Sequence, residues 1–433
     1  MRRRTPSSPG SAKNPASLRP PILEGVNEAF DRSALIELAL GDDAVASAAA
    51  GATTGAERWP QLCRLAAQWR VVPQVLARCG AVDRFDAPLR ARMRALMVAQ
   101  AARSASLLRT CAGVQEILGN AGLDSVAIKG IAAIATLYGA ASRRMIADVD
   151  LIIEPHGLSA ARTALEGAGF ADISPPFESH VAAIGFSRYL HNYARTFVRD
   201  GIEIDLHWRL GPRPPAPLVA QRILERSVRA RVERIDVRVS GPVETALIAV
   251  HHALRSSFPA SSTLKDAADL ALWWNLFGDL HGEALIATSR ECGLASSLLA
   301  LSRVIAAYNC SDAIGRGIAA LEAALPRAEH REAERLRAFI EHNLRVESPD
   351  DATVELLAPA VFTRSLVGPL LHGFGRNRTR ESGRGAGAPP IRRPVLARIR
   401  SRLERAAKIG RELLRFDRVA SYRAVARAQS RFH

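Results

Sequence analysis

Hydrophobic residues recur at three- and four-residue spacing through most of the first 120 residues, a pattern typical of amphipathic helices. The runs cover residues 34–40, 59–66, 71–78 and 88–120. We therefore expect a helical region over residues 23–122. Residues 1–22, which precede it, are rich in Pro, Ser and Gly and carry five basic residues, so they predict a disordered basic tail.

The spacing changes after residue 124, where short apolar runs and strict alternation predict strands. The predicted strands cover residues 126–128, 149–153, 195–199, 201–208 and 235–239, and residues 159–168 predict a helix between them. Asp200-Gly201 lies between two of the strands and favours a tight hairpin turn. Strands mixed with helices over residues 123–240 predict a small mixed-sheet core.

Helical spacing returns after Pro242, over residues 242–254, 265–276, 283–292 and 296–309. We expect a helical domain over residues 241–350, a linker over 351–394, and a basic amphipathic helix over 395–433. The fold class expected from this pattern is α+β, with the mixed-sheet core flanked by N-terminal and C-terminal helical regions.

The net charge of +16 is unevenly distributed along the chain. Residues 1–20 carry +5 and residues 376–433 carry +13, which leaves about −2 for the rest. This distribution of charge argues against a nucleic-acid-binding surface on the part of the chain between the two basic ends. The basic C-terminal tail remains a candidate for binding an acidic partner, RNA or a membrane surface; a solvated arginine face is the alternative.

Cysteine usage and hydropathy bear on the compartment. The five cysteines are widely spaced without a CxxC pair, so we expect buried, reduced thiols and neither a zinc site nor a disulfide framework. The basic N-terminus is followed by Pro, Ser and Gly in place of the apolar stretch of a signal peptide. No run is long enough to span a bilayer, so we expect a cytoplasmic protein.

A pair of acidic residues gives the first indication of chemistry. Asp148 and Asp150 precede and enter the strand 149–153, and alternation places both side chains on one face. Two carboxylates that face the same way repel one another unless a cation lies between them, and Mg²⁺ prefers oxygen ligands. Solvated carboxylates at a strand end are the alternative.

The strand at 201–208 carries a second polar face. Glu203, Asp205 and His207 alternate with Ile202, Ile204 and Leu206. Three polar groups on one face are costly to bury without partners, and a neighbouring strand bearing Asp148 and Asp150 could share a metal with them. An edge strand with a solvated face is the alternative, and His207 could equally be a structural histidine.

A strand that runs into a helix through Lys129-Gly130 is the third element. Glycine permits close backbone approach, a helix N-terminus favours anions, and Lys129 adds a point charge for phosphate. The spacing differs from that of a Walker loop. Arg144 could brace a phosphate from the opposite side, or could be an exposed loop arginine.

Taken in order, these elements resemble an uncharacterised bacterial nucleotidyltransferase family within the DNA polymerase beta-like superfamily. The matching motifs are Lys129-Gly130, Leu137-Tyr138, Arg144, Asp148-Val149-Asp150-Leu151, Gly169-Phe170 and Asp205-Leu206-His207-Trp208. His251-His252 and Lys265-Asp266 match a later helical segment of the family. The resemblance covers roughly residues 90–310.

The resemblance implies transfer of NMP from an NTP to a hydroxyl acceptor, with Mg²⁺ or Mn²⁺ as cofactor. Asp148 and Asp150 would bind both of two metal ions, and Asp205 the catalytic one. Lys129, Gly130 and Arg144 would bind the nucleotide, with Glu203 and His207 supporting the metal ligands. The acceptor implied is a small molecule, a peptide or a protein.

One departure leaves other functions open. Lys129-Gly130 stands where the superfamily has Gly-Ser, whose serine touches the triphosphate; the narrower family shares this replacement. A catalytically silent nucleotide-binding module is therefore one alternative to an enzyme, and the basic tail gives a second, an RNA-associated protein.

Overall fold

The computed structural model describes residues 28–41, 49, 58–79, 87–174, 194–210, 220–255 and 260–345. The expected basic tail at 1–22, the linker at 351–394 and the basic helix at 395–433 lie outside the described residues.

A seven-stranded mixed sheet lies at the centre of the described chain, in the order β3-β4-β5-β2-β1-β7-β6. The strands are β1 (Ser125–Ala127), β2 (Val149–Ile153), β3 (Ala171–Asp172), β4 (Ala194–Arg199), β5 (Ile202–His207), β6 (Val228–Val232) and β7 (Ile235–Val239). The pairs β2–β5 and β1–β7 are parallel, and the remaining pairs are antiparallel. The expected α+β class with a mixed sheet is confirmed.

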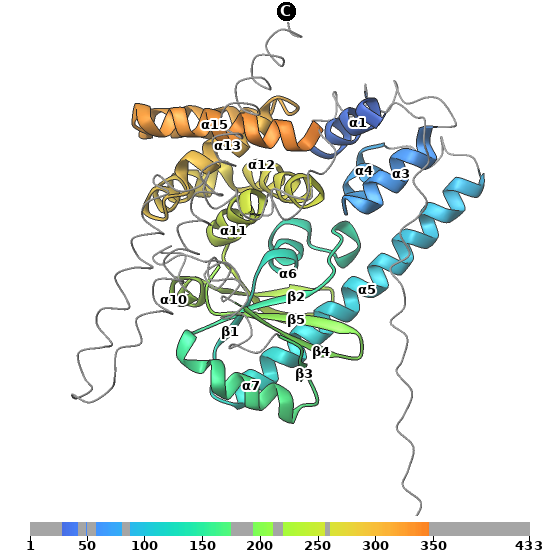
Figure 1. Cartoon of the computed structure of the whole chain (residues 1–433), viewed down its shortest axis with the longest axis vertical. Coiled ribbons are helices and arrows are strands. Elements are labelled where there is room, and N and C mark those ends of the chain that lie inside the picture. The colour runs from blue at the N-terminus through green and yellow to red at the C-terminus, as the bar shows by residue number, and fades with distance from the viewer. Residues whose placement is uncertain are drawn as a thin grey trace, which may run out of the picture.

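Helices cover both faces of this sheet (Figure 1). On one face lie α5 (Ala87–Asn120) and α7 (Leu158–Gly167), which share an apolar core with the inward residues of the strands. On the other lie α6 (Lys129–Ala133) with its π-helical extension Ile134–Tyr138, α10 (Ala220–Glu225) and α11 (Pro242–Arg255). The polar residues of β2 and β5 point to this second face, toward the helical part of the molecule.

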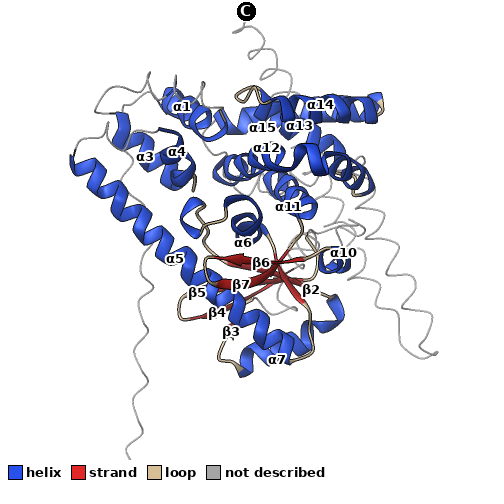
Figure 2. Ribbon diagram, turned by 180° about the vertical axis from the view of Figure 1, so that it is seen from behind, coloured by secondary structure: helices blue, strands red, loops and turns tan. Residues whose placement is uncertain are grey.

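The helices at the two ends of the described chain pack together (Figure 2). The N-terminal set is α1 (Glu28–Leu40), α3 (Arg58–Gln68) and α4 (Val72–Cys79); the C-terminal set is α12 (Ala260–Glu291), α13 (Ala295–Ala306), α14 (Asp312–Ala324) and α15 (Arg327–Arg345). They share one apolar core, and the Asn309 amide donates a 3.0 Å hydrogen bond to the Leu40 carbonyl. Trp273 and Trp274 lie buried in this core, as edge-to-face rings 5.3 Å apart.

The expected hairpin is confirmed at Asp200-Gly201, where both residues have positive φ, at 54° and 73°. Consecutive left-handed residues form the turn that matches strand twist. The expected helices at 265–276 and 283–292 are instead one continuous helix, α12. A Cβ at Gly278 would lie 3.2 Å from the Trp274 ring, so this glycine lets the ring pack closely, and neither Gly278 nor Gly282 ends the helix.

Three of the cysteines, Cys63, Cys111 and Cys292, are buried free thiols as expected. Cys310 is exposed, which corrects the expectation for that residue. Burial raises the pKa of the Cys111 thiol to about 12, so that group stays protonated. None of the helices in the described ranges is both long and apolar enough to cross a bilayer.

Candidate functional site

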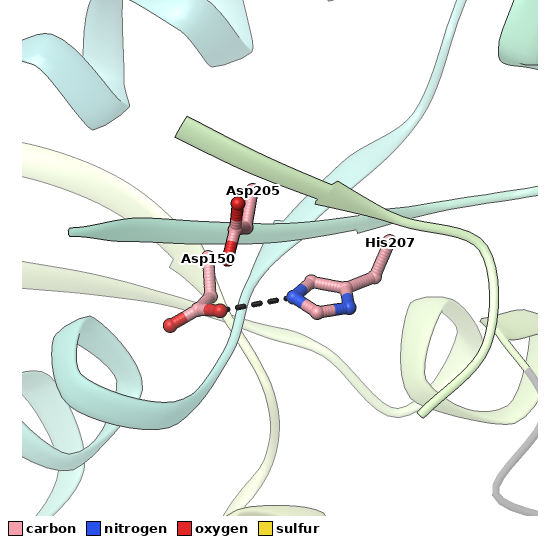
Figure 3. Close-up of side chains that lie close together, drawn as sticks. All are labelled: Asp150, Asp205 and His207. Atoms are coloured by element: carbon pink, nitrogen blue, oxygen red, sulfur yellow. Dashed lines mark hydrogen bonds and ion pairs between the residues drawn. The ribbon is translucent and has the colours of Figure 1, made fainter. Parts of the chain in front are cut away.

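Two acidic residues face each other across neighbouring parallel strands. The β2–β5 register pairs Asp150 with Asp205 and Ile152 with His207. Because paired residues share a face of the sheet, the three polar side chains point the same way (Figure 3). One ligand atom from each of Asp150, Asp205 and His207 lies within 4.8 Å of the other two. Below, these three residues are called the carboxylate site.

Neighbouring side chains fix the orientation of these acids. His207 Nε2 lies 2.9 Å from Asp150 Oδ1. Thr196, which pairs with Asp205 across β4 and β5, donates from Oγ1 to Asp205 Oδ1 at 2.7 Å. Burial lowers the pKa of His207, and the positive charge of Lys129 lowers it further. His207 is therefore expected to be neutral near pH 7.

Lys129 supplies positive charge to the carboxylate site. It follows the residue after β1 and begins α6 with φ at 52°, and its Nζ lies 2.5 Å from Asp150 Oδ1. Burial alone would raise the pKa of Asp150, but the Lys129 ammonium and the His207 contact hold it well below its usual range. Asp150 is 4% exposed and is therefore a buried carboxylate ion.

Asp148 and Glu203 differ in their relation to this site. Asp148 lies directly before β2, half-buried and outside the group of three. The charge of Asp150, together with burial, raises the pKa of Asp148, and Asp205 adds to this. The negative charges of Asp150 and Asp205 therefore both act on the pKa of Asp148. Glu203 shares the face of Asp205 but is exposed, opposite Val198.

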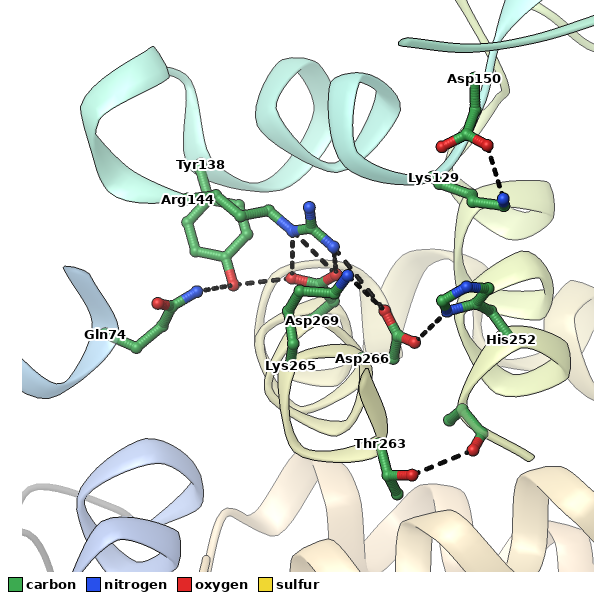
Figure 4. Close-up of polar contacts among 11 residues, drawn as sticks. Gln74, Lys129, Tyr138, Arg144, Asp150, His252, Thr263, Lys265, Asp266 and Asp269 are labelled. Carbon is green, nitrogen blue, oxygen red and sulfur yellow. Dashed lines mark hydrogen bonds and ion pairs between the residues drawn. The ribbon is translucent and has the colours of Figure 1, made fainter. Parts of the chain in front are cut away.

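Arg144 belongs to a second cluster, between the sheet domain and α12 (Figure 4). It is 1% exposed, and Asp269 accepts from both Nε (2.9 Å) and Nη2 (2.5 Å). Tyr138 donates to the same Asp269 at 2.8 Å and accepts from Gln74 at 3.2 Å. The structure thus holds Arg144 in a buried bidentate ion pair, which makes it neither an exposed loop arginine nor a freely mobile one.

Asp266, one turn before Asp269 on α12, extends this cluster. Its carboxylate lies 3.7 Å from Arg144 Nη2 and 2.5 Å from His252 Nδ1. Below, Arg144, Asp266, Asp269 and His252 are called the interdomain cluster. A cavity of about 10 Å³ lies beside this cluster and is bordered by Lys129, Arg144, His252, Asp266 and Asp269. This volume leaves room for about one water molecule.

Gly130 is explained by the side chains around it. A Cβ there would meet Ile146 Cγ2 at 2.5 Å and Arg144 Nη1 at 2.9 Å. Its glycine is therefore required for close packing of α6 on the segment that leads to Asp148. Gly130 links the two clusters, because Lys129 directly precedes it in the chain and the Arg144 side chain packs against it.

Sequence reasoning missed two partners at the site, Thr196 and Asp269, and gave Lys265 no role beside the carboxylates. Thr196 carries no motif signal beyond its place in an alternating strand. Asp269 lies 125 positions from Arg144, so only the fold brings the two together. Lys265 is mostly buried on α12, and its positive charge lowers the pKa of Asp148, although the raising influences prevail there.

The residues of the carboxylate site fit a divalent cation. Two carboxylates and one imidazole within ligand-sharing distance give the oxygen-rich set that Mg²⁺ and Mn²⁺ accept. Buried carboxylates are normally paired or metal-bound, and the described contacts give Asp150 a lysine while Asp205 has a threonine hydroxyl. The raised pKa of Asp148 reports the repulsion that a bound cation would relieve.

Three comparisons with known proteins bear on identity. The sequence profile of an uncharacterised nucleotidyltransferase family matches residues 55–308, more than half of the chain. Among solved structures, an antigenic nucleotidyltransferase-like protein from Paracoccidioides brasiliensis is similar at 18% identity, over 44% of this chain and 91% of that one, with a TM-score of 0.28. No curated protein matches.

Proposed function

Because the chain belongs to the uncharacterised nucleotidyltransferase family, we propose that it transfers NMP from an NTP to a hydroxyl-bearing acceptor. The observation that carries this proposal is the direct pairing of Asp150 with Asp205 on adjacent parallel strands, with both side chains on one face. We further propose that it is a bacterial, cytoplasmic enzyme of the DNA polymerase beta-like superfamily. Its acceptor is a small molecule, a peptide or a protein.

In this proposal Asp150 and Asp205 hold Mg²⁺ or Mn²⁺, and Asp148 adds a third carboxylate from the start of β2. A divalent metal bound there supplies Lewis acidity, which favours ionisation of the acceptor hydroxyl and offsets phosphate charge. His207 and Thr196 keep Asp150 and Asp205 oriented through their hydrogen bonds. Exposed Glu203 remains a candidate for contact with the acceptor.

Lys129 and Gly130 are proposed to receive the triphosphate, because they begin α6 beside the carboxylates. Arg144 borders the same small cavity as Lys129. Since Arg144 is 1% exposed and Asp269 engages its Nε and Nη2, we assign it to nucleotide binding only through the segment that it holds in front of Asp148.

The test is incubation with labelled ATP, GTP, CTP and UTP plus Mg²⁺ or Mn²⁺, with pyrophosphate release and label transfer as readouts. Asp148→Ala/Asp150→Ala and Asp205→Asn should each lower the rate by roughly 10³-fold or more, because each removes a ligand from the charged site. Asp236→Asn is the matched control, since Asp236 is an exposed acid on β7. Equal rates in wild type and double variant with all four nucleotides would refute the enzyme proposal.

A catalytically silent nucleotide-binding module is the second candidate, favoured by the Lys129–Asp150 ion pair, which places an ammonium at the acid that an active enzyme needs for metal. Nucleotide binding without turnover in any of these assays would support it. The RNA-associated alternative rests on the basic tail and predicts RNA binding that weakens steeply with salt and is lost on removal of residues 376–433.

A further inference from the structure

Lys129 holds an unusual position for a residue assigned to phosphate. Its Nζ lies 2.5 Å from Asp150 Oδ1, and the same oxygen lies 2.9 Å from His207 Nε2. The lysine side chain is 20% exposed, whereas Asp150 is buried. One oxygen of the central carboxylate is therefore already shared by an ammonium and an imidazole.

An ammonium and a divalent cation compete for this carboxylate. Both carry positive charge, and at a separation of a few ångströms in a partly buried site their repulsion is strong. Asp205 and Asp148 add negative charge nearby without a described lysine or arginine bond of their own. A metal that binds Asp150 and Asp205 therefore has to weaken or break the Lys129 contact.

Arg144, the other cationic side chain at the cavity that Lys129 borders, cannot act as a displaceable counter-ion. Asp269 holds Arg144 in a bidentate pair within the buried interdomain cluster. Lys129, in contrast, has a single ion pair among the described contacts and a flexible four-carbon stem. It can leave Asp150 without opening the interface between α12 and the sheet domain.

We infer that Lys129 is the resident counter-ion of the carboxylate site, and that a divalent cation displaces its ammonium from Asp150. The displaced ammonium then becomes available to a phosphate oxygen, so cation and nucleotide bind with positive coupling. The displacement step stands on the geometry alone, and the nucleotide step rests on the proposed function. Lys129 is thus a positioning residue whose charge sets the order of assembly.

The experiment is a titration of the full chain with Mn²⁺ in the absence of nucleotide, monitored by electron paramagnetic resonance or by calorimetry. Lys129→Met keeps side-chain length and removes the charge; it should bind Mn²⁺ about tenfold more tightly than wild type. Lys129→Arg, which keeps the charge, should bind no more tightly than wild type. Lys129→Gln guards against a local packing effect and should follow Lys129→Met, and thermal unfolding checks that each variant is folded.

Coupling is measured by binding of a fluorescent NTP analogue with and without Mn²⁺. Wild type should bind the analogue at least several-fold more tightly with Mn²⁺, and Lys129→Met should lose most of this gain. Unchanged or weaker Mn²⁺ binding by folded Lys129→Met and Lys129→Gln would overturn displacement. Tighter Mn²⁺ binding by both variants, with no analogue bound by wild type, would support displacement and contradict the proposed function, so the two failures are distinguishable.

Discussion

The carboxylate site and the interdomain cluster are both built from acids on the helical side of the sheet, yet their charges balance differently. In the interdomain cluster Arg144 bonds Asp269 with two nitrogens, and His252 contacts Asp266. In the carboxylate site, Asp205 is held by a hydroxyl, and Asp150 shares one oxygen between Lys129 and His207.

The difference separates a structural role from a chemical one. Burial would lower the pKa of Arg144, but Asp269 raises it above its ordinary value, which is the mark of a matched pair. At the carboxylate site the charge of Asp150 raises the pKa of Asp148, which is the mark of unrelieved repulsion. Matched charge joins two parts of the fold, and unmatched charge invites a cation.

The largest expected effect tests the matched cluster. Asp269→Ala leaves Arg144 buried without its bidentate partner and should lower the free energy of unfolding by about 3–5 kcal/mol. Asp279→Ala is the control on the same helix, because its pair with Arg316 is exposed, and it should cost under about 1 kcal/mol. Chemical denaturation measures both. Equal losses would show that the interdomain cluster contributes no more than a surface pair.

The next effect tests the unmatched site. His207→Gln removes the imidazole that lies 2.9 Å from Asp150 and should weaken Mn²⁺ binding about 10–100-fold, with a smaller effect on unfolding. His156→Gln, at an exposed position, is the control and should bind as wild type does. Metal affinity unaffected by His207→Gln would mean that the histidine serves the fold alone.

Gly130 lies where the two clusters meet, and replacing it should disturb both. Gly130→Ala forces a Cβ against Ile146 and Arg144 and should cost about 1–3 kcal/mol of unfolding free energy. Gly113→Ala in α5 has open space and should be neutral or stabilise by up to about 1 kcal/mol. The comparison is made by thermal and chemical unfolding; a neutral Gly130→Ala would contradict the described packing.

The smallest effect distinguishes two adjacent histidines. His252 pairs with Asp266, whereas His251 is held by the Leu210 carbonyl, and burial lowers the pKa of His251 to about 4. Because the unfolded chain takes up this proton near pH 6.5 and the folded chain near pH 4, stability falls as the pH drops through that window.

Between pH 7 and pH 5.5, the free energy of unfolding of His251→Gln should fall by about 1 kcal/mol less than that of wild type. The measurement is denaturant unfolding at several pH values, in which the variant's pH profile is subtracted from that of wild type. Parallel profiles would show that His251 is not buried as a neutral ring.

How far the sequence predicts these regions follows from how local their signals are. Alternation within β5 was enough to place Asp205 and His207 on one face, but it could not say that Asp150 on β2 shares that face. Strand register, which pairs Asp150 directly with Asp205, depends on the whole sheet and could not be read locally. The turn at Asp200-Gly201 was predictable because backbone conformation there is set by two adjacent residues.

Features that depend on distant packing were not predictable. Arg144 looked like a loop residue because its partner Asp269 lies on a helix that folds over the sheet much later in the chain. At Gly130 the sequence indicated close approach of a phosphate; the packing against Ile146 and Arg144 is an additional reason for glycine that no local pattern shows. The strand β6 was missed although its arginines alternate with apolar residues; it lies at an edge of the sheet, and only Val232 of its residues is buried.

The central claim is that Asp150 and Asp205 form a divalent-cation site, and Mn²⁺ titration tests it most directly. Wild type should bind Mn²⁺ at a site whose affinity falls at least tenfold in Asp205→Asn, with Asp236→Asn unchanged. Equal Mn²⁺ binding by wild type and folded Asp205→Asn would contradict the claim.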